Sequence, residues 1–358
     1  MPRNTLDRYS SAHCTPSRYR WFAVKSEHIG HQWSFSLEKT SKVRTVLVTE
    51  KFSDQRLDNF LIRELKGVPR TRIYRIIRRG EVRLNKKRAK PETRLKPGDK
   101  VRIPPLHLPD SQKLPEPSAG LVKLINQAIL HEDDDLLVLN KPPGLAVHLG
   151  TGIRLGLIEA VRQIHPNWGE AELAHRLDRD TSGAIILCKN ALALRDIQNQ
   201  FKRNCIEKRY HALVQGQWPE AVTEVKAALK RVLSESGERF VRVDPYGKPS
   251  STRFKIMERF SSTTLLEAYP VTGRTHQIRV HCQQAGYPIL GDPKYGGNNQ
   301  GEEVKGGSSV TAKYLCLHAA DIRFRRPGTD TLFKVSAPRD KSFAAQISKF
   351  RKMPSRSY

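Results

Sequence analysis

Residues 175–183, with the sequence His-Arg-Leu-Asp-Arg-Asp-Thr-Ser-Gly, gather the side chains in this chain that are best suited to chemistry. The first six positions hold one histidine, two arginines and two aspartates. The apolar run 184–188 follows and predicts a buried strand, so the charged cluster should lie on the loop that enters this strand. Loops held in place by a core strand are common positions for catalytic residues.

The two aspartates of this loop have different sequence surroundings. Asp180 precedes Thr-Ser-Gly, which favours a turn introducing the strand. Asp178 follows the apolar Leu177 and lies between Arg176 and Arg179, whose charges would keep its carboxylate ionised and oriented. Such a carboxylate can act as a nucleophile or a base, although an ordinary salt bridge within the loop fits the same spacing. We expect no metal here, because the arginines reduce the negative charge that a divalent ion requires.

Two further segments carry side chains that could take part in a reaction. Lys-Arg-Tyr places the phenol of Tyr210 at the head of a predicted strand, where a half-buried structural tyrosine is an equally good interpretation. The segment 274–281, Arg-Thr-His-Gln-Ile-Arg-Val-His, holds Arg279 and two histidines at a spacing that matches no common metal site.

The five cysteines form no C-x-x-C pair, and no glycine motif for phosphate binding is present. We therefore expect neither a metal nor a cofactor.

The elements that must position these residues alternate between strands and helices. Helices are predicted at 121–130 and 190–204, and a short helix or strand at Arg279. Strands outnumber helices and often follow one another through short turns, which indicates an α+β domain on a mixed, mainly antiparallel sheet. The predicted strands cover residues 136–140, 184–188, 209–215, 240–243, 252–258 and 263–268. We expect this domain to span residues 121–345.

A strong positive charge points to a polyanionic partner. Lysine and arginine number 63 against 36 acidic residues, a net charge of +27, and nucleic acid is the usual partner of such a protein. The excess of basic over acidic residues is concentrated between residues 51 and 103. In this region helices are predicted at 56–65 and 70–79, and short β segments at 81–84 and 100–103. Arginines three and four positions apart repel one another, so an anion is a better explanation for them than a solvated helix face. The residues expected to contact RNA phosphates are Arg70, Arg72, Arg75, Arg79, Lys86 and Lys87.

The remaining segments predict the domain boundaries. We expect a disordered leader at 1–42, or a start assigned too far upstream, and a basic tail at 346–358. The proline-rich stretch 104–120 predicts a linker between a small domain at 43–103 and the larger one. No stretch is long and apolar enough to span a membrane and no secretory signal is visible, so we expect a cytoplasmic protein.

Short motifs spread along the chain resemble two known families. Arg-Leu-Asp-Asn-Phe at 56, Val-Arg-Leu-Asn at 82 and Lys-Pro-Gly-Asp-Lys-Val at 96 resemble the S4-type RNA-binding domain. Six further segments, in order, resemble the RluA-type pseudouridine synthases, from the S4 region to beyond residue 318. These segments are 138–144, 175–183, 208–210, 274–279, 290–296 and 317–319. The leader has no counterpart in the family, and the glycine-rich stretch 297–311 has no assigned role.

The second resemblance implies a cofactor-free isomerisation of uridine to pseudouridine in RNA. The C1′–N1 bond breaks, the uracil turns, and C5 joins C1′. Asp178 matches the catalytic aspartate, which attacks C1′ or removes the C2′ proton, and Arg279 matches its basic partner. Tyr210 matches the tyrosine that stacks on the displaced base and assists deprotonation at C5. Arg176 matches the arginine that fills the gap left by the flipped uridine.

The implied substrate is large-subunit (23S) ribosomal RNA, before or early in ribosome assembly, because the S4 motifs favour ribosomal RNA. Two alternatives stay open: a transfer RNA pseudouridine synthase of the same family, and a non-catalytic S4-type rRNA-binding protein. An intact His-Arg-Leu-Asp segment speaks against the second alternative, since a pure binder has no need of Asp178. We expect a monomer with no small-molecule cofactor and no membrane partner.

Overall fold

The computed structural model describes residues 43–65, 68, 70–106, 114–150, 153–234, 238–296 and 312–352. These residues fold into two compact units, 43–106 and 114–352, and each is described by itself. The expected leader and the glycine-rich stretch 297–311 lie outside the described residues. None of the helices that the structure describes has the length and apolarity needed to cross a membrane.

The smaller unit packs two helices on a three-stranded antiparallel sheet with the order β1-β3-β2. Its elements are β1 (Arg44–Leu47), η1 (Glu50–Phe52), α1 (Leu57–Glu64), α2 (Arg70–Arg78), β2 (Arg83–Leu84) and β3 (Lys100–Ile103). Both predicted helices and both predicted β segments are therefore confirmed to within a few residues. The structure adds β1, which was not predicted.

Apolar side chains at helical spacing explain why this unit folds. Leu57, Phe60 and Leu61 of α1 are fully buried, and so is Ile73 of α2. Each helix therefore buries an apolar stripe in the shared core of this unit. The buried carboxylate of Asp58, in the Arg-Leu-Asp-Asn-Phe motif, accepts a hydrogen bond from the Tyr74 hydroxyl at 2.9 Å. Burial opposes its ionisation, yet hydrogen bonds from Arg56, Tyr74 and the Asn59 backbone hold its pKa below the ordinary value.

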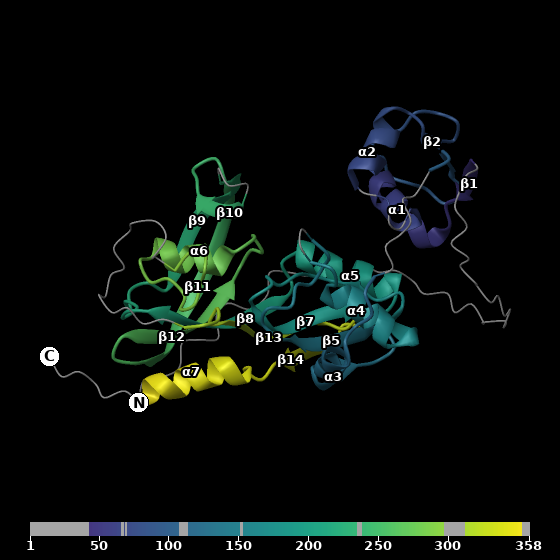
Figure 1. Ribbon diagram of the computed structural model, residues 1–358. Helices are drawn as coiled ribbons and strands as arrows, with labels where there is room; N and C mark the ends of the chain where they lie inside the picture. The colour runs from purple at the N-terminus through teal and green to yellow at the C-terminus, as the bar shows by residue number, and fades with distance from the viewer. Residues whose placement is uncertain are drawn as a thin grey trace. The chain divides into compact units, whose positions relative to one another are not determined.

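The larger unit contains an eleven-stranded sheet with helices on both faces (Figure 1). Its helices are α3 (Ala119–Gln127), α4 (Leu157–Ile164), η2 (Pro166–Trp168), α5 (Ala191–Lys202), α6 (Gln277–Gln284) and α7 (Lys341–Arg351). Its first strands are β4 (Ile129–Glu132), β5 (Leu136–Lys141), β6 (Glu172–Leu173), β7 (Ser182–Cys188) and β8 (Glu207–Gln215). The others are β9 (Glu224–Leu233), β10 (Arg239–Val243), β11 (Lys248–Arg259), β12 (Thr263–Pro270), β13 (Leu317–Arg325) and β14 (Leu332–Ser336).

The sheet follows the order β10-β9-β11-β12-β8-β13-β7-β5-β4, with β14 beside β13 and β6 beside β7. Every described pair is antiparallel except β13 with β7, which meet in parallel through His318 opposite Ser182 and Ala319 opposite Gly183. An α+β domain on a mixed, mainly antiparallel sheet is therefore confirmed. The parallel pair lies at the centre, where the loop carrying Asp178 enters β7.

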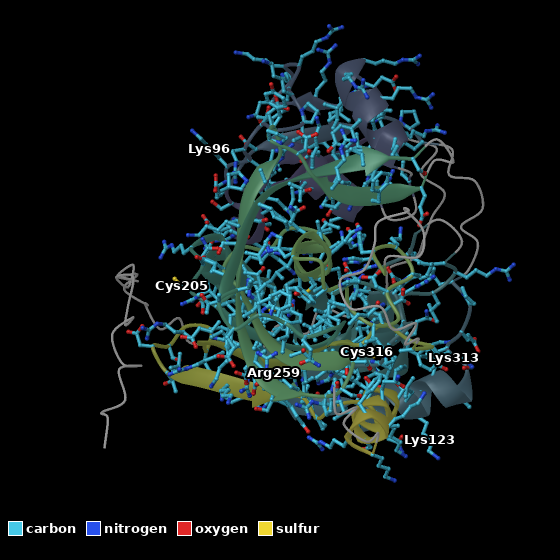
Figure 2. All side chains as sticks on the ribbon, turned by 90° about the vertical axis from the view of Figure 1, so that its left-hand side faces the viewer. Lys96, Lys123, Cys205, Arg259, Lys313 and Cys316 are labelled. Atoms are coloured by element: carbon cyan, nitrogen blue, oxygen red, sulfur yellow. The ribbon has the colours of Figure 1, made fainter. Side chains whose placement is uncertain are left out.

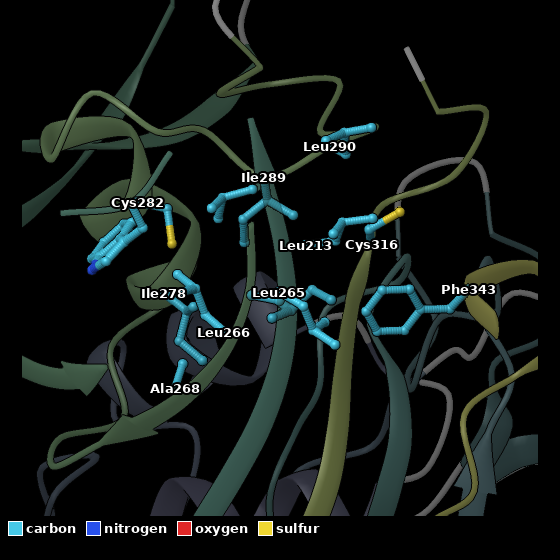
Figure 3. Packing of buried hydrophobic residues seen from close by; sticks show 14 of the residues in the cluster. Leu213, Leu265, Leu266, Ala268, Ile278, Cys282, Ile289, Leu290, Cys316 and Phe343 are labelled. Atoms are coloured by element: carbon cyan, nitrogen blue, oxygen red, sulfur yellow. The ribbon is translucent and has the colours of Figure 1, made fainter. Parts of the chain in front are cut away.

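Apolar layers cover both faces of the sheet around β8 and β12. Figure 3 shows Ile278 and Cys282 of α6 beside Leu266 and Ala268, while Phe343 of α7 lies beside Leu213, Leu265 and Cys316. Because side chains alternate along a strand, the two helices cover opposite faces. A second layer joins α4 to β5 and β7. Charged side chains such as Lys96, Lys123 and Lys313 lie at the surface (Figure 2).

Three expectations from the sequence need correction. The helix expected at 121–130 ends at Gln127, because the chain turns into β4. The expected linker at 104–120 is shorter at both ends, since Leu106 is buried in the small unit and α3 begins at Ala119. Residues 346–351 are not a tail but the end of α7, whose Ile347 and Phe350 are buried in the core. Helices α4 and α7 and strands β4, β6, β9, β13 and β14 were not predicted.

Candidate active site

The loop that carries Asp178 is held at its end by a close approach of two strands. The Thr181 N–H donates to the Asp178 carbonyl at 3.2 Å and closes a turn just before β7. Gly183 then adopts φ +110°, and a Cβ at this position would collide with the Ala319 backbone, whose nitrogen would lie 2.6 Å away. Only glycine permits this conformation and this approach. The turn and the strand contact together fix where the loop ends.

Two side chains, the half-buried His175 and the fully buried Lys141, anchor the rest of the loop. His175 accepts a hydrogen bond from the Ile186 N–H through Nε2, and burial together with the charge of Lys208 lowers its pKa to about 3, so the imidazole is neutral. The fully buried Lys141 donates from Nζ to three backbone carbonyls. They belong to Pro142 at 2.9 Å, Leu145 at 2.9 Å and Arg179 at 2.8 Å.

The protonation state of Lys141 follows from these three acceptors. Burial lowers its pKa to about 7, against the attraction of Asp180 and Asp178. An ammonium has three N–H donors, whereas a neutral amine has two, so only the charged form satisfies all three carbonyls. Lys141 therefore ties the loop backbone at Arg179 to the turn that follows β5.

Tyr210 lies in the same row of paired residues as Lys141, which runs across β5, β7, β13 and β8. Ala319 is opposite both Gly183 of β7 and Tyr210 of β8, and Gly183 is in turn opposite Lys141 of β5. Residues that are directly opposite one another point to the same face, so Lys141 and Tyr210 share a face. On β12, Ala268 is opposite Tyr210 and lies on the face that α6 covers. Burial and the nearby charge of Asp178 raise the pKa of the Tyr210 phenol.

Helix α6 brings Arg279 to Asp178. Arg279 Nη1 donates to Asp178 Oδ2 at 3.2 Å, so the predicted pair is present. The guanidinium also binds both oxygens of the buried Asp292, each at 2.7 Å, and its Cζ lies 5.0 Å from the centre of the Tyr295 ring. Although burial opposes the charge of Arg279, Asp292 and Asp178 raise its pKa, so it is a permanent cation.

Two other side chains of the segment 274–281 hold α6 on the sheet. Gln277 donates to the Ser251 carbonyl and to Thr252 Oγ1, both at 2.9 Å, and the fully buried His281 contacts the hydroxyls of Ser250 and Thr252. His276 begins the helix with its Nε2 3.8 Å from Asp178 Oδ2. The same segment thus supplies the partner of Asp178 and the contacts that position it.

Most of the other predicted residues are exposed. Arg176 is exposed beside the buried Leu177, and the Asp180 carboxylate pairs with Arg179 at 3.0 Å in the turn. In the small unit Arg72 is half-buried, while the other predicted RNA contacts are exposed: Arg70, Arg75, Arg79, Lys86 and Lys87. Within the described ranges, no group of three or more His, Cys, Asp or Glu side chains could hold a metal ion.

Four residues that contribute to this geometry were not singled out from the sequence as functional. They are Lys141, His276, Asp292 and Tyr295. Each lies in a segment that resembles the family, at 138–144, 274–279 or 290–296, and this resemblance was the available signal. Their partners are distant in the chain or are backbone carbonyls, so residue spacing could not reveal their contacts.

The chain matches known proteins over both units. The family model for RNA pseudouridylate synthase matches residues 135–284, and that for the S4 domain matches residues 55–101. Ribosomal large subunit pseudouridine synthase C of Escherichia coli is 46% identical over 315 residues, covering 87% of this chain and 98% of that protein. The protein of the same name from Haemophilus influenzae is 45% identical over 312 residues, covering 87% and 96%.

A solved structure shares the fold of the larger unit. Human RNA Pseudouridylate Synthase Domain Containing 4 has a TM-score of 0.52 and 24% identity to this chain, covering 66% of it and 97% of that structure. The curated relatives match along nearly their whole length at an identity that is far above chance. The chain therefore belongs to the pseudouridine synthase family of RNA-modifying isomerases and carries an S4 domain ahead of its synthase domain.

Proposed function

We propose that this protein isomerises specific uridines of large-subunit ribosomal RNA to pseudouridine, with Asp178 as the catalytic group and without a cofactor. The names of its relatives support the substrate, because they are ribosomal large subunit enzymes that match along almost the whole chain. The S4 domain and the net charge of +27 support binding to a structured RNA. We further propose that it acts as a monomer in the cytoplasm, before or early in ribosome assembly.

The observation that carries the catalytic assignment is the setting of Asp178. Its carboxylate pairs with the buried Arg279 through Oδ2, yet 18% of its side chain is still exposed. Arg279 and Asp178 form an ion pair at 3.2 Å. The group is therefore charged, oriented and accessible, as a nucleophile or a base must be.

The isomerisation needs a carboxylate but no external reactant. Asp178 would either form a bond to C1′ as the C1′–N1 bond breaks, or accept the C2′ proton as the uracil anion leaves. In the first route the detached uracil turns and its C5 displaces the Asp178 carboxylate from C1′. In the second route C5 bonds to C1′ as Asp178 returns the proton to C2′. The C5 proton is then lost and N1 gains a proton, so the product is an isomer of the substrate.

Tyr210 and Arg176 are suited to handling the base. The pKa of Tyr210 is raised, so its phenol is neutral at physiological pH and is a better stacking platform than a base. Arg176 is exposed next to the loop backbone of Asp178, from where its guanidinium can enter the gap that the flipped uridine leaves. Flipping costs a few kcal/mol, which such contacts would offset.

The assignment is tested by the release of tritium from large-subunit rRNA labelled at C5 of uridine. Asp178→Ala should abolish release and leave RNA affinity unchanged. Asp330→Ala makes the same chemical change at an exposed turn and should leave release intact. Undiminished release by Asp178→Ala would overturn the catalytic assignment. Release from transfer RNA, with none from ribosomal RNA, would overturn the proposed substrate.

A further inference from the structure

His276 occupies an unusual position between Asp178 and Tyr295. It precedes the first residue of α6 with φ 53° and ψ 18°, a left-handed conformation that side-chain-bearing residues rarely adopt. Its Nδ1 lies 2.7 Å from the Tyr295 hydroxyl, and its Nε2 lies 3.8 Å from Asp178 Oδ2. A strained backbone that aims a titratable ring at a reactive carboxylate suggests a functional role.

The hydrogen bonds of Tyr295 determine which ring nitrogen of His276 carries the proton. The Val241 N–H donates to the Tyr295 oxygen at 2.9 Å, so the phenolic proton is free to be donated elsewhere. Its partner is His276 Nδ1, and because Nε2 faces the Asp178 carboxylate, we infer that Nδ1 accepts the phenolic proton. A neutral imidazole that accepts at Nδ1 carries its proton on Nε2, the nitrogen that faces Asp178.

The charges around His276 agree with a neutral ring. Burial lowers the pKa of His276 to about 4, although Asp178 attracts the protonated form. Burial also raises the pKa of Tyr295 to about 12, which keeps its hydroxyl a donor. The charged and titratable groups that face the ring come from four segments: Asp178, Glu238, Arg279, Asp292, Lys294 and Tyr295.

We propose that His276 is a positioning residue for Asp178, held by Tyr295 as the tautomer that presents Nε2–H to the carboxylate. This inference rests on the proposed function of Asp178. Both His276 and Arg279 approach the same oxygen, Oδ2, so Oδ1 is left to the substrate. The distance of 3.8 Å is too long for a hydrogen bond, and we expect it to shorten in the complex with substrate.

The neutral state of the ring matters for the reaction. An imidazolium at this position would be a second cation beside Arg279. It would lower the reactivity of Asp178 by stabilising the negative charge of the carboxylate. A neutral N–H donor orients the carboxylate while leaving most of its charge available. Tyr295 therefore has a role distinct from packing, because its hydroxyl selects the tautomer of His276 and disfavours the imidazolium.

Kinetics of the full-length enzyme test the contact with Asp178. His276→Ala should lower kcat for tritium release from large-subunit rRNA by about tenfold to a hundredfold, since hydrogen bonds to charged groups are worth that much. KM should change by less than about threefold, because RNA binding does not use this contact. His276→Gln, whose amide can donate from a similar position, should recover most of kcat. His165→Ala, which removes a histidine paired with Asn126, is the matched control. Its kcat and KM should equal those of the parent enzyme.

Nuclear magnetic resonance of 15N-histidine tests the tautomer. The His276 ring should be neutral with its proton on Nε2 and should titrate well below its ordinary pKa of about 6.5. In Tyr295→Phe the ring loses its Nδ1 donor while its burial remains, so its pKa should rise above that in the parent protein, and the acid limb in the pH profile of kcat should move to higher pH. Tyr287→Phe removes the hydroxyl of a ring that packs on Trp218. It should change neither the pKa of His276 nor the pH profile of kcat.

The outcomes separate this inference from the proposed function. If Asp178→Ala is inactive while His276→Ala keeps full kcat, the positioning role is wrong and the catalytic aspartate stands. An Nδ1–H tautomer, or no change of the His276 titration in Tyr295→Phe, would also overturn the inference. If Asp178→Ala is fully active, the proposed function itself fails. A kcat loss in His276→Ala that His276→Gln does not recover would indicate a structural role instead.

Discussion

Arg279 divides its donors between two carboxylates, and this division holds Asp178 less firmly than Asp292. Nε and Nη2 bind the buried Asp292, whereas only Nη1 reaches Asp178, at 3.2 Å. A guanidinium with one bidentate partner keeps its orientation when a weaker second partner leaves. In the proposed mechanism, Asp178 would therefore move toward C1′ or C2′ while Asp292 keeps Arg279 in place.

Tyr210 offers a test of stacking against proton transfer. Burial and Asp178 raise the pKa of its phenol, so its oxygen is a poor base at neutral pH. Tyr210→Phe keeps the ring, and we expect kcat for tritium release to fall by less than about threefold. Tyr210→Leu removes the aromatic face and should lower kcat by about tenfold or more, because stacking is worth about 1–3 kcal/mol per base.

The contrary outcome for Tyr210 is equally informative. If Tyr210→Phe were as inactive as Tyr210→Leu, the phenolic oxygen would take a direct part in moving a proton. Circular dichroism of both variants should match the parent protein, which would show that the loss of activity is not a loss of folding. The half-buried position of this tyrosine on β8, between β12 and β13, makes that control necessary.

At the scale of elements, the parallel contact of β7 with β13 determines where the loop that carries Asp178 ends. Gly183 has φ +110° at the point where a Cβ would collide with the Ala319 backbone. Gly183→Ala should therefore lower the free energy of unfolding by about 3 kcal/mol or more, since both strain and a backbone clash oppose it. Urea denaturation followed by tryptophan fluorescence measures this, because Trp168 and Trp218 are buried in the larger unit.

Gly120→Ala is the control for this substitution. Gly120 lies in α3, and a Cβ there would meet only Ser118 Oγ, at 4.0 Å. Alanine favours a helix over glycine by about 1 kcal/mol, so this variant should be as stable as the parent or more stable. Equal stability of Gly183→Ala and the parent would mean that β7 and β13 can separate without cost, contrary to the role given to their contact.

Local sequence patterns predicted the elements whose partners lie nearby. The apolar spacing of Leu57, Phe60 and Leu61 is sufficient to predict α1, and the continuous apolar run at 184–188 is sufficient to predict a buried strand. Helix α7 was missed because its basic residues suggested a tail. Its buried residues Phe343, Ile347 and Phe350 nevertheless have helical spacing, and their burial depends on a sheet formed far earlier in the chain.

The site could be predicted only where family-like motifs carry the chemistry. The pair of Asp178 and Arg279 followed from the resemblance, and the structure shows it at 3.2 Å across 101 positions of sequence. The role of Lys141 could not be predicted in this way, because its acceptors are backbone carbonyls, which no residue type reveals. The bond from His276 to Tyr295 likewise depends on the turn that follows α6.

At the scale of the whole molecule, binding and chemistry are assigned to different units on one chain. A covalent connection raises the effective concentration of the synthase unit near RNA that the S4 unit has bound. The excess of basic residues extends beyond the S4 unit, because the full chain carries 63 lysines and arginines against 36 acids. Total charge alone could therefore account for binding, and the contribution of the S4 arginines needs a variant that is matched for charge.

The final prediction separates these two contributions. Arg75 and Arg79 are exposed on and just after α2, where side chains can reach phosphates. The double variant Arg75→Gln with Arg79→Gln should raise KM for large-subunit rRNA by about tenfold and leave kcat unchanged. The slope of log Kd against log salt concentration should fall by about two, one for each phosphate that is no longer neutralised by an arginine.

The control removes the same charge from the synthase unit. Lys123→Gln with Lys349→Gln replaces two exposed lysines on α3 and α7. Fluorescence anisotropy with an rRNA fragment, at roughly 50 to 300 mM KCl, should give this variant nearly the parent slope because salt-dependent affinity follows phosphate contacts. If both double variants bind with equally reduced affinity, general charge attracts the RNA and the S4 arginines make no localised contact. A reduction confined to Arg75 and Arg79 would support the S4 unit as the part of the enzyme that selects where the synthase unit works.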